Sequence, residues 1–138
     1  MNEAGKRKIP DIAAEAEAVI QSLVHEDHRG YDRLDLKTNQ IRKFLAAVTS
    51  VTNQIEVWHM QHIDTDVLPD ELAAAVKYLK VKLAYQAGRE KSVKEFAEKA
   101  ELARRIDAIG RDRRKYQEFA HFVEALVAYH RFHGGRES

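Results

Sequence analysis

The chain has 138 residues, of which 44 % are hydrophobic and 33 % are charged, and its formal net charge at pH 7 is +1. This length suits one domain with its own core, and the absence of cysteine excludes disulfides, cysteine-ligated zinc and iron–sulfur clusters. No apolar run approaches the roughly 20 residues of a membrane span, and the N-terminal MNEAGKRKIP lacks the apolar stretch of a secretion signal. We therefore expect a soluble cytoplasmic protein without a membrane partner.

The charge is unevenly distributed along the chain. Residues 1–70 contain 8 Lys or Arg and 12 Asp or Glu, whereas residues 71–138 contain 15 and 10. A basic C-terminal half indicates an anionic partner. The alternative is that folding interleaves the two halves and cancels the contrast.

Hydrophobic periodicity predicts helices in the first half of the chain, and no alternating strand pattern competes with it. The first helix is expected over 11–27, with Gly30 beyond its end. The second is expected to begin at Thr38 as its N-cap. Its apolar residues recur at three- and four-residue spacing and predict one buried face: Ile41, Phe44, Leu45, Val48, Val51, Ile55 and Trp58.

Three more helices are expected in the second half. The third follows Pro69 and stops at Gly88. The fourth opens with SVKE, in which Ser92 and Glu95 have the spacing of a capping box. The fifth runs over 112–133.

Glycines lie at the expected ends of these helices. Gly110 is either a helix end or only a kink in a longer fourth helix, and the pair at 134–135 closes the last helix. The sequence therefore predicts an all-α protein, a compact bundle of about five helices, over 11–133. A flexible basic arm is expected over 1–10 and a disordered tail over 134–138.

Two Glu-x-x-His pairs invite a di-iron carboxylate site, because such bundles place this motif on two helices. The pairs are Glu56 with His59 and Glu118 with His121. Helical geometry turns Glu56 roughly 100° away from the apolar face of its helix, and it directs Glu118 and His121 to solvent. We therefore expect no metal site.

Enzymatic motifs are missing from the sequence. It has no Gly-x-Ser-x-Gly elbow, no phosphate-binding loop and no dinucleotide fingerprint. Its acidic residues alternate with basic ones, as on a solvated helix face, instead of clustering around a metal. We expect a protein that is not an enzyme and that carries no cofactor.

A basic-aromatic stripe is the most informative feature. Tyr78, Lys82, Tyr85 and Arg89 share one side of the third helix, and further cations lie near them or at the start of the second helix: Lys77, Lys80, Lys37, Arg42 and Lys43. Such a surface could bind a nucleic-acid backbone, with a tyrosine left to stack. The alternative is that both tyrosines pack in the core while the cations extend outward.

A second basic run, from Arg104 to Lys115, has the sequence RRIDAIGRDRRK. We interpret it as a solvated turn region, or alternatively as a subunit contact.

Three stretches in this order resemble a known family. They are LKTNQIRKFL (36–45), YLKVKLAYQAGRE (78–90) and FAHFVEALVAYHRFHGG (119–135). The pattern resembles the small helical subunit of the type III-A CRISPR Csm effector complex, and the likeness covers residues from about 12 to 135.

The resemblance implies a helical bundle without a catalytic centre. Several copies would stack as an inner filament beside the backbone subunit and the large subunit, which carry the RNA-cutting and DNA-cutting activities. Basic surfaces of the small subunit would contact the backbone of the guide RNA and target RNA duplex, and base pairing would supply the sequence recognition.

Carried onto this chain, the resemblance nominates RNA-facing residues on the second and third helices. These are Lys37, Gln40, Arg42, Lys43, Lys80, Lys82 and Arg89. In the last stretch, Glu124, Tyr129 and His130 are expected to fix the bundle or to contact a neighbour. Two alternatives stay open: a helical adaptor that contacts only protein, and the di-iron bundle.

Overall fold

A computed structural model describes residues 11–134 and contains six helices and a two-stranded hairpin within that range. In chain order the elements are α1 (Ile12–Leu23), β1 (His25–Glu26), β2 (Asp32–Arg33), α2 (Thr38–Met60), α3 (Asp70–Arg89), α4 (Lys91–Lys99), α5 (Leu102–Ile109) and α6 (Arg113–Phe132). The all-α class is confirmed. The predictions for the arm over 1–10 and for residues 135–138 lie outside the described range.

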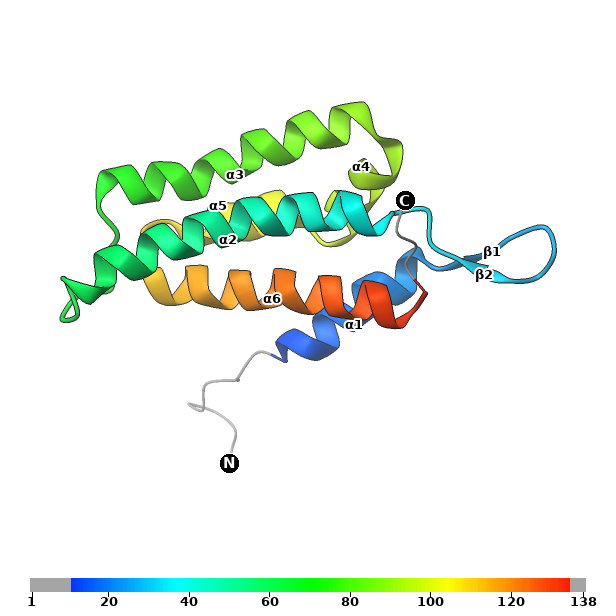
Figure 1. The fold of residues 1–138 in the computed structure, drawn as a ribbon, viewed down its shortest axis with the longest axis horizontal. Coiled ribbons are helices and arrows are strands. Elements are labelled where there is room, and N and C mark those ends of the chain that lie inside the picture. The colour runs from blue at the N-terminus through cyan, green and yellow to red at the C-terminus, as the bar shows by residue number, and fades with distance from the viewer. Residues whose placement is uncertain (1–10, 135–138) are drawn as a thin grey trace.

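Helix α6 is the centre of the bundle and packs against α1, α2 and α5. Its inward face is apolar and is almost entirely buried: Tyr116, Phe119, Ala120, Phe122, Val123 and Leu126. Helix α3 forms an outer layer that rests on α2, α4 and α5 and lies along one edge of the molecule (Figure 1). One flank of α3 is therefore left to solvent. None of the described helices is long and apolar enough to span a membrane.

The first helix ends at Leu23, so the prediction that it extends to residue 27 was wrong. Val24 adopts an extended conformation, and the chain continues into the antiparallel hairpin of β1 and β2, which projects from the helical body (Figure 1). A carboxylate oxygen of Asp27 accepts hydrogen bonds from the backbone N–H groups of Arg29 at 2.8 Å and Tyr31 at 3.0 Å. These bonds hold the turn, as Asx turns do.

Helix α2 buries its predicted face, with Leu45 and Trp58 only partly buried, and the first residues of α2 and α3 differ slightly from the prediction. Lys37 is the N-cap of α2, and the predicted cap, Thr38, is the first helical residue and is buried. Pro69 is the N-cap of α3, which begins with Asp70 and Glu71. Acidic side chains in a first turn interact favourably with the helix dipole.

The predicted fourth helix is two short helices, because Glu101 has a left-handed backbone with φ of 53° between them. The capping box was wrong: α4 begins at Lys91 after Glu90, so Ser92 lies inside the helix, where its hydroxyl donates to the side chain of Gln40. Gly110, with φ of 57°, ends α5 and is a true helix end.

All five arginines of the run 104–115 form ion pairs, and Arg104, Arg111 and Arg114 stay largely exposed to solvent, as the interpretation of a solvated region expected. Arg113 Nε and Arg114 Nε lie 2.8 Å and 3.1 Å from the carboxylate oxygens of Asp66, and Arg111 pairs with Asp70 at 2.6 Å. These contacts fasten the start of α6 to the loop that precedes α3. The Arg113 guanidinium lowers the pKa of Asp66.

Candidate nucleic-acid interface

A groove of about 680 Å³ runs between α2 and α3. Small side chains form its α2 wall, namely Ala46, Ala47 and Ser50, with Lys43 at one end. Long side chains form its α3 wall: Tyr78, Val81, Lys82, Tyr85 and Arg89. Phe44 and Gln86, both buried, lie at its base. The groove is therefore open and partly apolar.

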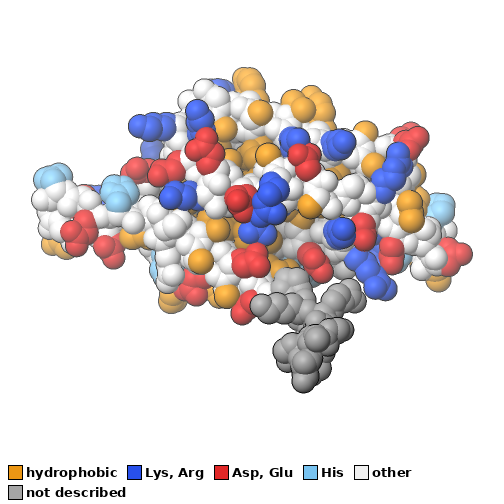
Figure 2. Space-filling model, turned by 180° about the vertical axis from the view of Figure 1, so that it is seen from behind, with side chains coloured by type: hydrophobic (Ala, Val, Ile, Leu, Met, Phe, Trp, Pro, Cys, Tyr) orange, Lys and Arg blue, Asp and Glu red, His pale blue; other side chains and the backbone are white. Residues whose placement is uncertain are grey.

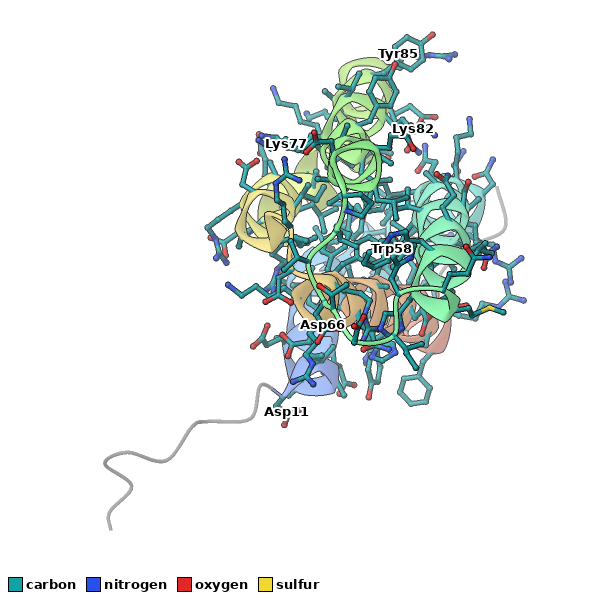
Figure 3. The ribbon with its side chains drawn as sticks, turned by 90° about the vertical axis from the view of Figure 1, so that its left-hand side faces the viewer. Asp11, Trp58, Asp66, Lys77, Lys82 and Tyr85 are labelled. Carbon is teal, nitrogen blue, oxygen red and sulfur yellow. The ribbon has the colours of Figure 1, made fainter. Side chains whose placement is uncertain are left out.

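The tyrosines of the groove are exposed, so they do not pack in the core as the alternative interpretation expected. The exposed fraction is 56 % for Tyr78, 69 % for Tyr85 and 51 % for Val81. Figure 3 shows Tyr85 at the outer edge of α3, Lys82 on the side that faces α2, and Lys77 on the side that faces α5. The stripe predicted from sequence thus forms one wall of a real groove.

The cations of the groove lack acidic partners. Lys43, Lys82 and Arg89 are exposed, and no carboxylate of the described residues lies within ion-pair distance of them. The Arg89 guanidinium instead lies 5.6 Å from the centroid of the Tyr85 ring. Glu90 is the acidic residue of this lining, and its carboxylate accepts a hydrogen bond from Gln40 at 3.1 Å. Positive charge therefore exceeds negative charge in the groove.

The opposite face of the molecule differs from the groove. Basic and acidic side chains alternate across it (Figure 2). On α5, which lies behind α2 in Figure 1, Arg105 pairs with Glu15 at 3.2 Å and Arg104 pairs with Glu101 at 2.6 Å. An interleaved surface of this kind produces little net field. The unpaired cations of the groove are therefore the better candidates for binding an anion.

Lys37 and Arg42, two further predicted residues, are exposed near the start of α2 but do not line the groove. They extend the positive surface around the first turns of that helix, where unsatisfied N–H groups also favour anions.

Gln40 and Lys80 make structural contacts instead of facing the groove. Gln40 Oε1 accepts from the Lys37 N–H at 2.8 Å and from the Ser92 hydroxyl at 3.0 Å. The Gln86 amide donates to the Gln40 carbonyl oxygen at 2.8 Å. This network joins the start of α2 to the end of α3 and to α4, and it fixes one end of the groove. Lys80 forms an ion pair on the other flank of α3.

Near the end of α6, His130 is fully buried, and its Nε2–H donates to the Leu36 carbonyl oxygen at 2.5 Å. Burial lowers the pKa of His130, so the ring is neutral at pH 7. The bond holds the end of α6 against the segment that leads into α2. This contact fits the first of the two roles expected for His130, which was to fix the bundle.

The two Glu-x-x-His pairs do not form a metal site. The side chains of Glu56, Glu118 and His121 are all exposed, as helical geometry predicts. Glu56 and His121 line one small depression between α2 and α6, whereas Glu118 lines another one beside α5. His59 lies 3.8 Å from Asp66. Within residues 11–134 no group of three or more His, Asp or Glu side chains comes together that could hold a metal ion.

Sequence reasoning missed the α2 wall of the groove. Ala46, Ala47 and Ser50 are small residues at three- and four-residue spacing, a pattern that permits close approach or leaves space beside a helix. The sequence alone does not distinguish these outcomes, because the answer depends on where α3 packs.

The fold and the groove define a class of small all-helical proteins with an open, cation-lined surface. Comparison with known proteins specifies the family. The family model of Csm2 from type III-A CRISPR systems matches residues 14–136, and the chain belongs to this family. The resemblance inferred from sequence is therefore confirmed.

Individual relatives agree with the family assignment. The chain is 38 % identical over 116 residues to the CRISPR system Cms protein Csm2 of Streptococcus thermophilus, covering 84 % of this chain and 86 % of the relative. It is 33 % identical over 98 residues to the protein of the same name from Mycobacterium tuberculosis strain H37Rv, covering 71 % and 75 %. It is 29 % identical over 114 residues to that of Enterococcus italicus, covering 78 % of each.

Proposed function

We propose that this chain is a non-catalytic structural subunit of a type III-A CRISPR ribonucleoprotein, the Csm complex, and that it contacts RNA through the α2–α3 groove and the adjoining start of α2. Its partners would be the guide RNA and target RNA, the backbone and large subunits of the complex, and further copies of itself in an inner filament. The observation that supports RNA contact is the set of unpaired cations in the groove, Lys43, Lys82 and Arg89.

Ribose-phosphate is the chemistry that this surface suits. Ammonium and guanidinium groups without acidic neighbours are free to neutralise phosphates, and each neutralised phosphate releases counterions. Few phosphates are within reach of one copy, so the free subunit should bind RNA weakly. Repeated copies along one RNA would raise the overall affinity by avidity.

The residues nominated from sequence would have different roles. Lys43, Lys82 and Arg89 would contact phosphates in the groove, and Lys37 and Arg42 would extend this surface along the first turns of α2. Gln40 and Lys80 would support the groove indirectly, because their side chains already bond to other parts of the protein.

Charge reversal tests the proposal in the assembled complex. Replacing Lys43, Lys82 and Arg89 together by Glu should weaken capture of target RNA at least about tenfold and lower the salt slope of binding by about 2. A matched control reverses three exposed lysines outside the groove, Lys94, Lys99 and Lys115. Equal capture by both triple variants, with the subunit folded and incorporated, would refute the proposed RNA surface.

A protein-contact role has its own supporting observation. Exposed apolar side chains gather at the end of α2 and in the following loop, where Val57 is 65 %, Met60 76 % and Ile63 77 % exposed. Such a patch is typical of a protein contact. If the chain were only a protein adaptor, its crosslinking to RNA within the complex would be absent or insensitive to salt.

A further inference from the structure

The α2–α3 groove contains more apolar and aromatic surface than contact with phosphates requires. Tyr78, Val81 and Tyr85 are each more than half exposed along its α3 wall. Exposed aromatic side chains beside unpaired cations are the usual composition of surfaces that bind unpaired nucleotides. We propose that the groove accommodates an unpaired nucleotide of the RNA, with its base stacked on Tyr85; this inference rests on the proposed RNA-binding function.

The spacing along α3 supports this occupant. Tyr78, Lys82, Tyr85 and Arg89 follow one another at four-, three- and four-residue intervals, so ring and cation alternate along the groove. The two tyrosines are separated by roughly 10 Å along the helix axis, from a rise of 1.5 Å per residue. A single strand of RNA also alternates bases with phosphates along its length. The alternation therefore matches an opened strand better than a continuous row of phosphates.

The Tyr85 ring lies beside a cation that helps to position it for stacking on a base. The Arg89 guanidinium lies 5.6 Å from its ring centroid, which is within the range of a cation–π contact. Tyr85 lies at the outer edge of α3, and Lys82 lies on the α2 side of the same helix (Figure 3). A base on Tyr85 would thus have Lys82 and Arg89 within the same groove for its flanking phosphates.

The α2 wall leaves room for the base. Ala46, Ala47 and Ser50 have short side chains and face the long side chains of α3 across the groove. Bases inside a regular duplex are stacked on their neighbours and do not offer their faces, and A-form RNA is bound through its backbone and 2′-hydroxyls. An unpaired base can therefore stack on the tyrosine ring, whereas a base paired within a duplex cannot.

The charge of the groove favours RNA over an apolar segment of protein. Three cations line it against one carboxylate, Glu90, which is already engaged by Gln40. An apolar helix would leave these cations without partners. An acidic peptide would pair with the three cations without contacting the tyrosine ring. Binding of such a peptide should therefore not depend on Tyr85, whereas binding of an unpaired base should.

The experiment uses the purified full-length chain and three RNA probes at low salt: a regular duplex, the same duplex with one bulged 2-aminopurine nucleotide, and a single strand. Quenching of 2-aminopurine fluorescence reports stacking, and anisotropy reports affinity. The variants are Tyr85→Ala, Tyr85→Phe and Tyr85→Leu. Tyr31→Ala is the matched control, because Tyr31 is 64 % exposed and lies 5.7 Å from the Arg29 guanidinium, but in the hairpin.

We expect the wild-type chain, Tyr85→Phe and Tyr31→Ala to quench the bulged probe and to prefer it over the regular duplex. Tyr85→Ala and Tyr85→Leu should lose the quenching and bind the bulged probe about 5- to 150-fold more weakly, the range expected for loss of one base–aromatic stack. Their binding to the regular duplex should not change.

Three results would overturn the inference. If the Tyr85 variants bind the bulged probe like the wild-type chain, while binding stays salt-dependent, base stacking is refuted and the proposed RNA contact stands. If a poly-glutamate peptide of equal charge displaces the bulged RNA as well as unlabelled RNA does, the groove recognises charge and not a base. If no probe binds in a salt-dependent manner, RNA binding by the free chain and the inference fail together.

Discussion

Lys80 and Asp107 form an ion pair that joins α3 to α5, with the ammonium nitrogen 2.8 Å and 3.0 Å from the two carboxylate oxygens. Lys82, two residues further along α3, points to the other flank and lines the groove with α2. Two lysines of one basic stretch therefore have separate roles, one in the bundle and one at the candidate RNA surface.

This separation predicts opposite phenotypes for two matched variants. Lys80→Ala should lower the free energy of unfolding by about 0.2–1 kcal/mol, as expected for an exposed ion pair, and should leave RNA binding unchanged. Lys82→Ala should leave stability unchanged and should weaken RNA binding. Urea unfolding and fluorescence anisotropy on both variants check this. Reduced RNA binding by Lys80→Ala alone would contradict the assignment.

The hydrogen bonds of the Gln40 side chain should stabilise one end of the groove. Gln40→Ala removes side-chain hydrogen bonds to the Lys37 N–H, Glu90 and Ser92 and should cost about 2 kcal/mol of unfolding free energy, at roughly 0.5–1.5 kcal/mol per bond. Asn39→Ala, at the exposed neighbouring position, is the control and should change stability much less. Equal urea midpoints for the two variants would show that the network does not stabilise α2.

His130 predicts a pH dependence of stability. Burial lowers its pKa below the ordinary 6.5, and Arg131 lowers it further, despite the opposing effect of the hydrogen bond to Leu36. As the pH falls below 6.5, the unfolded chain therefore binds a proton that the folded chain does not, and stability decreases toward the folded pKa.

His130→Gln keeps an N–H donor for the Leu36 carbonyl and removes the titration. The difference in unfolding free energy between wild type and this variant should shift against the wild type as the pH is lowered from 7.5 to 5. Using a difference cancels His25, whose pKa is raised mainly by its hydrogen bond with Asp35 and whose contribution has the opposite sign. Parallel stability curves would exclude His130 as the titrating group.

The stability of the hairpin turn should decrease in acid, because it depends on the ionised carboxylate of Asp27. The Arg33 hydrogen bond, followed by that from the Tyr31 N–H, lowers the pKa of Asp27 to about 2. The ionised carboxylate therefore stabilises the turn above the ordinary pKa of 3.8, and this contribution is lost as the pH falls through about 2. Asp27→Ala should accelerate amide exchange at Arg29 and Tyr31 at pH 5. Asp32→Ala, in β2, should not, and equal exchange in both would refute the role of Asp27.

The helical faces were predictable from sequence because burial follows helical periodicity. Ile41, Val48 and Ile55 recur every seven residues and are all buried, and Gly110 ends α5 with the positive φ that glycine tolerates. These features depend on local spacing and local backbone preference, which a single sequence records.

The hairpin and the division of the lysines were not predictable in the same way. The turn depends on hydrogen bonds to one carboxylate, that of Asp27. Hydrophobic periodicity does not reveal such bonds. The direction of Lys80 depends on Asp107, which α5 brings alongside α3 only in the folded bundle. The break at Glu101 was missed because a left-handed conformation is uncommon for a residue other than glycine.

Crosslinking the assembled Csm complex to a bound target RNA, followed by mapping of the crosslinked peptides of this chain, tests the central claim most directly. We predict crosslinks in peptides that contain Lys43 or residues 78–89, and their yield should fall as the salt concentration rises. Crosslinks confined to the opposite face, or none to this chain in a complex that retains its target RNA, would contradict the claim that the α2–α3 groove binds RNA.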